Sequence, residues 1–363
     1  MKYATLTFHR TTNYGAMLQT YALQRAIEKM GVETEVLDYR SPALEARLKG
    51  WKWYRYLDPR IIYAFIARNS YKRDNRKSFK AFSDVYIKKS PRIYTTRNEL
   101  EEAGNYYDKF IVGSDQVWNP GCTGWDDNFF LNFTKLHKRN SYAASFGFSD
   151  TNGDEREWLT QKLKGFNHVS VREASGVKLY EELTGDMSEQ VMDPTFLLSK
   201  EEWSEIAAKK IVRQEKKPYI LLYLLAETNS IIDFAKKVAS ETGRKVIYIN
   251  DRLLPKRGIV NKFYVSPAEW LSYFINADLV VTNSFHGIAF STNLNLQFWV
   301  ELLPPPSNVN ARILDLLEAL DLSSRIITND IDINCKINYS ITNKVLEKMK
   351  SQSVNYLQKL INE

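Results

Sequence analysis

The chain has 363 residues, with 50 Lys and Arg against 43 Asp and Glu, 44% hydrophobic residues and two cysteines. This length and apolar content exclude wholesale disorder and favour two globular domains. No apolar stretch reaches the roughly 20 residues of a membrane helix, the N-terminus lacks the apolar run of a signal peptide, and two distant cysteines make no disulfide framework, so we expect a cytoplasmic protein.

The first segment has the pattern of a βαβ unit. A strand from Tyr3 to Phe8 leads through a polar loop into a helix from Gly15 to about Met30, and Gly31 ends this helix. A second strand covers Glu33 to Tyr39 and stops before Ser41-Pro42. Two such strands joined by a helix predict a parallel sheet.

A basic, aromatic and helical insertion covers about residues 43–97. Between Arg47 and Arg97 it holds 15 basic and three acidic residues, so the rest of the chain is acidic overall. We expect no nucleic-acid partner, because such a protein would not confine its basic residues to one insertion. Two alternatives stay open: segment 47–97 binds an anionic membrane peripherally at its inner face, or it is a solvated helical face with core aromatics.

Strands and helices alternate through the rest of the chain. The charged stretch 200–217, ended by Pro218, separates two runs of these elements. We predict an N-terminal Rossmann-like domain over 1–205, a C-terminal Rossmann-like domain over 206–340, and a helix in 341–363 that packs back on the first domain. The predicted fold class is α/β with mostly parallel sheets. Its later strands are expected at 108–112, 140–145, 169–172, 191–192, 219–225, 245–250, 279–282 and 297–301.

Polar residues follow several of these strands, where open α/β sheets bind ligands. Asn13 and Gly15 stand at the start of the first helix, whose N–H groups favour an anion. An Asn-capped helix with a tight turn is the alternative. The segment is neither a dinucleotide fingerprint nor a P-loop, so neither dinucleotide nor ATP binding is indicated.

A second candidate site follows the strand that ends at Val112. Ser114, Asp115, Gln116 and Trp118 come directly after it. Asp115 has the chemistry of a base or of a ligand for sugar hydroxyls, and Trp118 has the ring to stack on a sugar. An Asp-capped turn with a core tryptophan explains the same pattern.

Two further candidates end later strands. Arg172 offers a guanidinium for a phosphate or carboxylate, or else a salt bridge with Glu173. In the second domain Asn283, Ser284 and His286 lie where a strand leads into a helix, and His286 has the chemistry of a proton donor or an anion ligand. The four histidines and two cysteines have no metal-ligand spacing, so no metal site is predicted.

Four segments together resemble the polysaccharide pyruvyl transferase family over nearly the whole length. They are Asn13-Tyr14-Gly15-Ala16-Met17-Leu18-Gln19 with Leu37-Asp38-Tyr39-Arg40, then Gly113-Ser114-Asp115-Gln116-Val117-Trp118-Asn119, Val169-Ser170-Val171-Arg172-Glu173 and Thr282-Asn283-Ser284-Phe285-His286-Gly287, and Asp193-Pro194-Thr195 adds a fifth match. The resemblance implies a GT-B-like arrangement of two Rossmann-like domains. It also implies transfer of pyruvate from phosphoenolpyruvate, as donor substrate without a cofactor, to a sugar as a cyclic ketal.

The resemblance also implies roles for particular residues. Arg172 would contact the donor and His286 would act in catalysis. Asp115 is our own candidate for a base on the acceptor side. A lysine found in some members about twenty residues beyond the histidine is missing here, and Arg312 is our substitute for it. The acceptor is expected in a polysaccharide or a lipid-linked precursor.

Two other functions remain open. A GT-B-type glycosyltransferase that uses a nucleotide sugar would have the same architecture. A non-catalytic carbohydrate-binding protein would bind sugar without turning over either donor.

Overall fold

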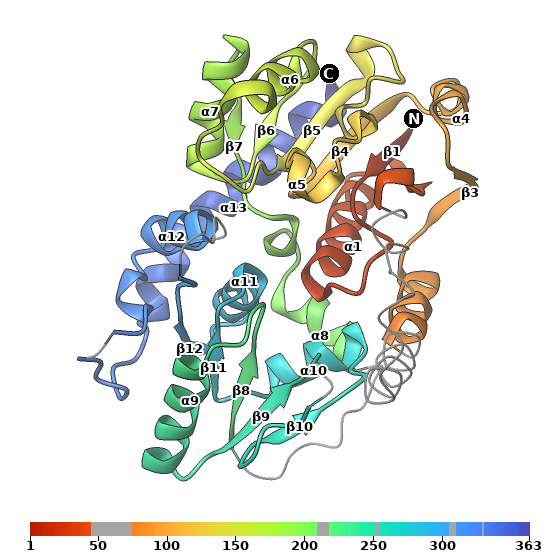
Figure 1. The fold of residues 1–363 in the computed structure, drawn as a ribbon. Coiled ribbons are helices and arrows are strands. Elements are labelled where there is room, and N and C mark those ends of the chain that lie inside the picture. Colours follow the sequence, from red (N-terminus) through yellow and green to blue (C-terminus); the bar gives the residue numbers. More distant parts are fainter. Residues whose placement is uncertain (45–74, 209–217, 252–253, 305–309, 329) are drawn as a thin grey trace, which may run out of the picture. The chain divides into compact units, whose positions relative to one another are not determined.

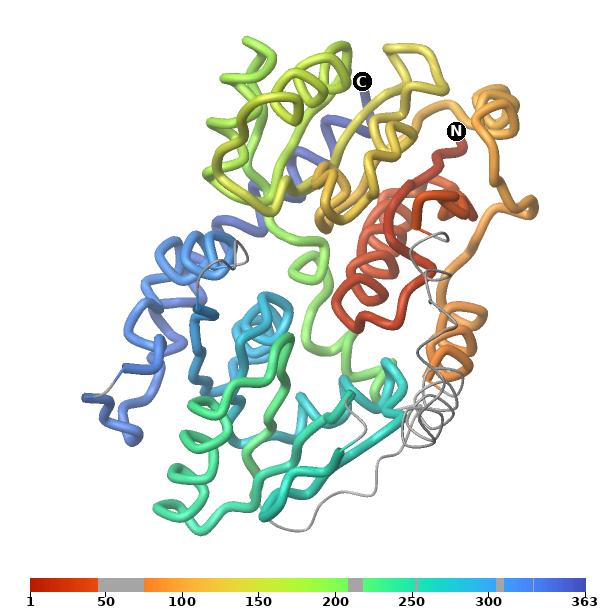
Figure 2. The backbone as a smooth tube through the Cα atoms, viewed as in Figure 1, coloured from red at the N-terminus to blue at the C-terminus, as the bar shows by residue number. Residues whose placement is uncertain are grey.

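The computed structural model describes residues 1–44, 75–208, 218–251, 254–304, 310–328 and 330–363. These residues divide into two compact units, and Figure 2 follows the backbone through each of them. Unit 1 contains residues 1–44, 83–197 and 346–363. Unit 2 contains residues 75–82 and the described residues between 198 and 345.

Unit 1 is built on a seven-stranded sheet in the order β3-β2-β1-β4-β5-β6-β7, and all its paired strands are parallel (Figure 1). Short strands β6 and β7 form one edge. The strands are β1 (Lys2–Leu6), β2 (Glu33–Tyr39), β3 (Lys89–Tyr94), β4 (Lys109–Asp115), β5 (Arg139–Ala144), β6 (Ser170–Val171) and β7 (Glu189–Gln190).

Helices cover both faces of this sheet because successive residues of a strand point to opposite sides. In β4, Phe110 and Val112 belong to one hydrophobic core, whereas Ile111 belongs to the other. The last helix contributes to the Ile111 side, where the Tyr356 hydroxyl donates to the Ser141 carbonyl at 2.8 Å. The helices are α1 (Tyr14–Lys29), α4 (Arg97–Ala103), α5 (Pro120–Thr123), α6 (Gly153–Leu163), α7 (Ala174–Thr184) and α13 (Tyr339–Asn362), with 3-10 turns η2 (Asp127–Phe130), η3 (Leu136–Lys138) and η4 (Pro194–Phe196).

Unit 2 has a five-stranded parallel sheet in the order β10-β9-β8-β11-β12. Its central strands are almost wholly apolar, as expected for a parallel sheet covered on both faces. The elements are α8 (Lys200–Ala208), β8 (Tyr219–Tyr223), α9 (Asn229–Thr242), β9 (Lys245–Ile249), β10 (Val260–Lys262), α10 (Pro267–Ile275), β11 (Leu279–Thr282), α11 (Phe285–Asn293), β12 (Gln297–Val300), α12 (Asn310–Ala319) and η5 (Ser323–Arg325).

The structure differs from the sequence-based boundaries in two places. Residues 89–94, predicted as part of the helical insertion, form strand β3, and the Arg40 N–H donates to the Tyr94 carbonyl at its end. Residues 198–205, assigned to the first domain, group with unit 2. Residues 45–74, which make up most of the predicted insertion, lie outside the described residues. None of the described helices is long and apolar enough to cross a membrane.

Candidate functional site

A buried ion cluster lies at the carboxyl edge of unit 1, which is the edge where its parallel strands end. Arg172 follows β6, and its Nε donates to Glu173 Oε1 at 2.7 Å while Nη1 donates to Asp193 Oδ2 at 3.0 Å. The arginine side chain is 2% exposed. Burial by itself would lower the pKa of Arg172, but Glu173 and Asp193 raise it above its ordinary value. The salt bridge with Glu173, one of the two alternatives for Arg172, is therefore present.

Hydroxyl groups connect this ion cluster to the neighbouring strand ends. Ser114 Oγ donates to Asp193 Oδ2 at 2.9 Å, and Ser145 Oγ donates to Glu173 Oε1 at 2.9 Å. The ends of β4, β5 and β6 are thus joined around one guanidinium. Ser114 was predicted to bind substrate; in the structure the residue is fully buried and its hydroxyl donates to Asp193, so the substrate contact stays a prediction.

Asp115, the last residue of β4, has an unusual backbone conformation. Asp115 has a φ of 71°, and Ala143 on the neighbouring strand has a φ of 52°. Asp115 Oδ1 accepts the Gln116 N–H at 2.9 Å, and Gln116 Oε1 accepts from Asn119 Nδ2 at 3.0 Å. Non-glycine residues with positive φ are uncommon and concentrate at functional sites. This distortion keeps Asp115 as a candidate base and Gln116 as a candidate substrate ligand.

Gly147 allows this turn to pack closely against the end of β5. A Cβ atom at Gly147 would lie 2.0 Å from Gln116 Oε1, and the residue has a φ of 76°. Both the space and the backbone therefore require glycine.

Trp118 lies in the hydrophobic core. Its side chain is 0% exposed, and its ring is stacked with those of Phe130 and Tyr180 at centroid distances of 6.2 and 6.1 Å. The prediction that Trp118 stacks on a sugar is wrong, because no ligand can reach a ring enclosed in this way. The alternative of a core tryptophan describes the structure.

Asn13 is the N-cap of α1, and its Oδ1 accepts the Ala16 N–H at 3.0 Å. Gly15 is buried in the first turn of the same helix. The Asn-capped helix that the sequence offered as one alternative is therefore present. Anion binding by Asn13 and Gly15 stays a prediction.

Sequence patterns did not reveal a second ionic cluster at the ends of β1 and β2. Asp38 Oδ1 lies 2.9 Å from His9 Nε2 and 2.6 Å from Arg10 Nε, and Asp38 Oδ2 accepts from Arg10 Nη2 at 2.7 Å. Burial would raise the pKa of Asp38, but the hydrogen bonds and charges of His9 and Arg10 hold it well below its ordinary value. The βαβ pattern of the first segment was the available signal. It predicts that β1 and β2 are neighbours, which brings the residues at their carboxyl ends together.

In unit 2, His286 lies in the first turn of α11. Its side chain is largely buried, with 7% of the residue exposed. The His286 ring is perpendicular to that of Phe285, with the centroids 5.3 Å apart. The Arg312 guanidinium lies 6.0 Å from the centre of the same Phe285 ring. The structure therefore brings together two predicted residues, His286 and Arg312, that are 26 positions apart.

The start of α11 packs tightly against the end of β11. Ser284 is the N-cap, and its Oγ accepts the Gly287 N–H at 3.4 Å. A Cβ atom at Gly287 would lie 2.3 Å from Thr282 Oγ1, so glycine permits this approach. Ser284 thus has a structural function that positions the helix turn carrying His286, and its predicted contact with substrate remains untested.

Asn283 connects two loops at this edge of unit 2. Its Oδ1 accepts the N–H groups of Leu225 and Ala226 at 2.8 and 3.4 Å, and its Nδ2 donates to the Ala226 carbonyl at 2.7 Å. The residue is fully buried. The amide of Asn283 therefore holds the loop after β8, and its predicted contact with substrate stays a prediction.

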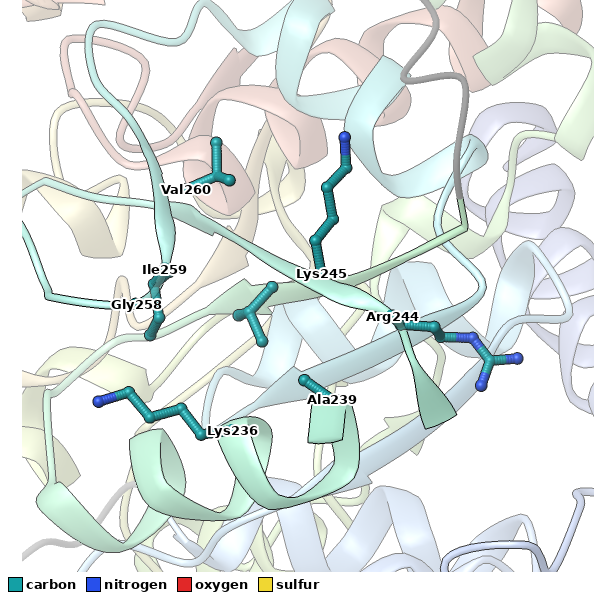
Figure 3. Close-up of a pocket in the computed structure, with 8 residues that line it drawn as sticks. Lys236, Ala239, Arg244, Lys245, Gly258, Ile259 and Val260 are labelled. Carbon is teal, nitrogen blue, oxygen red and sulfur yellow. The ribbon is translucent and has the colours of Figure 1, made fainter. Parts of the chain in front are cut away.

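An open pocket of about 400 Å³ lies at the opposite, amino end of the unit 2 sheet. Its lining includes Lys236, Arg244 and Lys245 together with Gly258 and Val260. Figure 3 shows the three cationic side chains extending in different directions. The three cations therefore do not converge on one point where a compact anion would bind. The pocket is at the amino end of the strands, whereas His286 follows the carboxyl end of β11, so the two are apart.

No group of three or more His, Cys, Asp or Glu side chains in the described part of the chain could hold a metal ion.

Two Rossmann-like units with parallel sheets and polar side chains at their carboxyl edges give the protein a GT-B-like α/β fold. The sequence profile described as polysaccharide pyruvyl transferase matches residues 13–300. The chain belongs to this family, which confirms the resemblance drawn from the motifs. No curated protein sequence matches the chain.

Solved structures are similar to the chain at low sequence identity. The UDP-N-acetylglucosamine 2-epimerase from Rickettsia bellii is 10% identical, with a TM-score of 0.55 and coverage of 100% of this chain and 95% of that chain. The UDP-GlcNAc 2-epimerase from Neisseria meningitidis, bound to UDP-GlcNAc, is also 10% identical, with a TM-score of 0.49 and coverage of 99% and 93%. At such identity the similarity concerns the fold alone.

Proposed function

We propose that the chain transfers pyruvate from phosphoenolpyruvate to two hydroxyls of a sugar, forming a cyclic ketal and releasing phosphate. The observation that carries this proposal is the family match over residues 13–300, which includes the helix turn of His286. The packing of His286 and Arg312 on the same Phe285 ring supports it further, because a proton donor and a cation are then near one another.

The reaction balances with one acid and two hydroxyls. His286 donates a proton to the methylene carbon of phosphoenolpyruvate, which makes the neighbouring carbon electrophilic. One sugar hydroxyl attacks this carbon and loses its proton to a base, for which Asp115 is the candidate. A second hydroxyl then displaces phosphate and loses its proton. One of the two released protons restores His286 and the other leaves with phosphate.

The cations have separate functions in this proposal. Arg312 neutralises the donor's negative charge beside His286. The resemblance to the family implies a donor contact by Arg172 as well. In the structure Arg172 Nε and Nη1 are bonded to Glu173 and Asp193, so a direct donor contact by these two atoms requires those bonds to change.

The acceptor in this proposal is a polysaccharide or lipid-linked sugar. Four cations in the described part of segment 47–97 already have acidic partners, namely Lys88 with Glu33, Lys89 with Asp84, Arg92 with Glu102 and Arg97 with Glu101. Peripheral membrane binding would therefore depend mainly on the remaining basic residues of 47–97. Sedimentation with anionic and neutral vesicles tests it, and equal binding at low salt would contradict it.

The test of function is phosphate release from phosphoenolpyruvate in the presence of a panel of sugar acceptors, with the product mass measured in parallel. His286→Asn should abolish both signals, whereas the exposed His137→Asn should retain them. Consumption of a nucleotide sugar with no turnover of phosphoenolpyruvate would overturn the proposal in favour of glycosyl transfer. Sugar binding with no turnover of either donor would instead indicate a carbohydrate-binding protein.

A further inference from the structure

Trp125 is an exposed tryptophan at the carboxyl edge of unit 1. It is 49% exposed, whereas Trp118, Trp203 and Trp270 are fully buried. It comes directly after α5 and Gly124, in the segment that follows the end of β4. An exposed apolar ring of this size forgoes the favourable free energy that its burial would give, so the exposure of Trp125 needs an explanation.

The backbone places this ring in an uncommon conformation. Trp125 has a φ of 63°, directly after Gly124 with a φ of 70°. Positive φ is a genuine outlier for a bulky residue, and such strain is found mainly where the surrounding structure enforces it at functional sites. The Trp125 N–H nevertheless donates to the Pro120 carbonyl at 3.3 Å, so the turn is hydrogen-bonded.

Neighbouring residues fix the turn from two sides. The Trp125 ring contacts that of Trp158 in α6, with the centroids 5.0 Å apart and the planes at 65°. The next residue, Asp126, accepts hydrogen bonds from the Tyr39 hydroxyl at 2.6 Å and from Ser41 Oγ at 2.5 Å, at the end of β2. Trp125 is therefore an exposed ring on a rigid support, which lowers the entropy lost when a ligand binds.

We propose that Trp125 is the platform on which a pyranose ring of the acceptor stacks. The proposal rests on the proposed function for the kind of ligand, since a flat indole matches the C–H face of a sugar. It gives Trp125 the stacking contact predicted for Trp118, which the core encloses. The position also fits, because Asp115 is the last residue of β4 and Trp125 lies in the segment that follows this strand.

The experiment is saturation-transfer NMR of the full chain with a panel of methyl pyranosides. Trp125→Gly is the main variant, because glycine accepts the positive φ and the turn is kept. Trp125→Phe keeps a smaller aromatic ring at the same position. Tyr106→Ala is the control, because Tyr106 is 71% exposed and precedes β4 at the opposite edge. Melting temperatures of all four proteins establish that each is folded.

The proposal expects at least one pyranoside to bind the wild type and Tyr106→Ala equally. Its affinity should fall about tenfold in Trp125→Gly and recover in part in Trp125→Phe. Equal affinity in Trp125→Gly, or no binding of any pyranoside to the wild type, would overturn it. Stacking of uridine diphosphate instead of the pyranosides would also overturn it.

This outcome is separate from that of the proposed function. Binding is measured without phosphoenolpyruvate, so loss of sugar binding in Trp125→Gly stands even if no pyruvate is transferred. Conversely, phosphate release that persists in Trp125→Gly with an unchanged KM for the acceptor would reject the platform and leave the reaction intact.

Discussion

The carboxyl edges of the two sheets are stabilised in different ways. In unit 1, buried carboxylates bind arginines: Arg172 lies between Glu173 and Asp193, and Asp38 binds Arg10 and also contacts His9. In unit 2, neutral groups bind the loops, namely the amide of Asn283 and the hydroxyl of Ser284. The described ring contacts of His286 and Arg312 are with Phe285. The comparison indicates that the charged side chains of unit 1 have a mainly structural function. In unit 2, by contrast, the charge of Arg312 lies near the candidate acid His286.

The largest expected effect that tests this difference between the units is a loss of turnover when His286 of unit 2 is replaced. His286→Asn should reduce kcat by about 10²–10⁴-fold, because an aligned general acid contributes that much. The melting temperature should stay close to that of the wild type, because asparagine keeps a polar side chain in the first turn of α11. A steady-state assay of phosphate release together with thermal melting measures both. Unchanged kcat would remove His286 from the reaction.

Arg172→Met should instead destabilise the protein. The substitution leaves Glu173 and Asp193 buried without their shared cation, and breaking a buried pair in this way costs about 3–5 kcal/mol. The free energy of unfolding from urea titrations measures the loss. A variant as stable as the wild type would mean that the cluster has no structural function. A stable but inactive variant would place Arg172 on the donor instead.

Asp38→Asn should give a smaller loss with a defined pH dependence. The pKa of Asp38 in the folded protein is below its ordinary value of about 4. Its stabilising contribution is therefore complete above that value and is lost as the pH falls toward the folded pKa. Asp38→Asn should cost about 2 kcal/mol at pH 7, and the difference from the wild type should shrink as the pH falls below about 4. A pH-independent difference in the free energy of unfolding would contradict the ionic explanation.

Asn283→Ala should have the smallest effect of this series. It removes an amide that binds the loop at Leu225 and Ala226, and the net contribution of such hydrogen bonds is about 1 kcal/mol. Hydrogen exchange should increase at residues 225 and 226 with little change in unit 1. An Asn283→Ala variant that loses activity but keeps full stability would support Asn283 as a substrate ligand.

The sequence was sufficient for much of the fold because apolar strands alternate with helices in a regular order. It did not reveal β3, because this edge strand, Lys89–Tyr94, lies in a basic segment with little apolar pattern. For the candidate site, motif position identified His286 and Arg172 as residues at strand ends. Burial is not contained in a motif, so Trp118, Ser114 and Asn283 could not be distinguished from surface residues before their packing was known.

Residues that act through distant partners were also missed. Asp38 and His9 are 29 positions apart, and only the pairing of β1 with β2 brings them together. Trp125 stands out through its exposure and positive φ, neither of which can be read from sequence.

The most direct test of the central claim follows phosphoenolpyruvate that carries a heavy carbon at its enol position. Carbon NMR would be recorded on the full chain with a sugar that binds it. Pyruvyl transfer predicts that the enol signal is replaced by a ketal signal on the sugar, at the rate of phosphate release, and that His286→Asn prevents this change. A label that remains in phosphoenolpyruvate, or that appears as free pyruvate, would contradict the assignment.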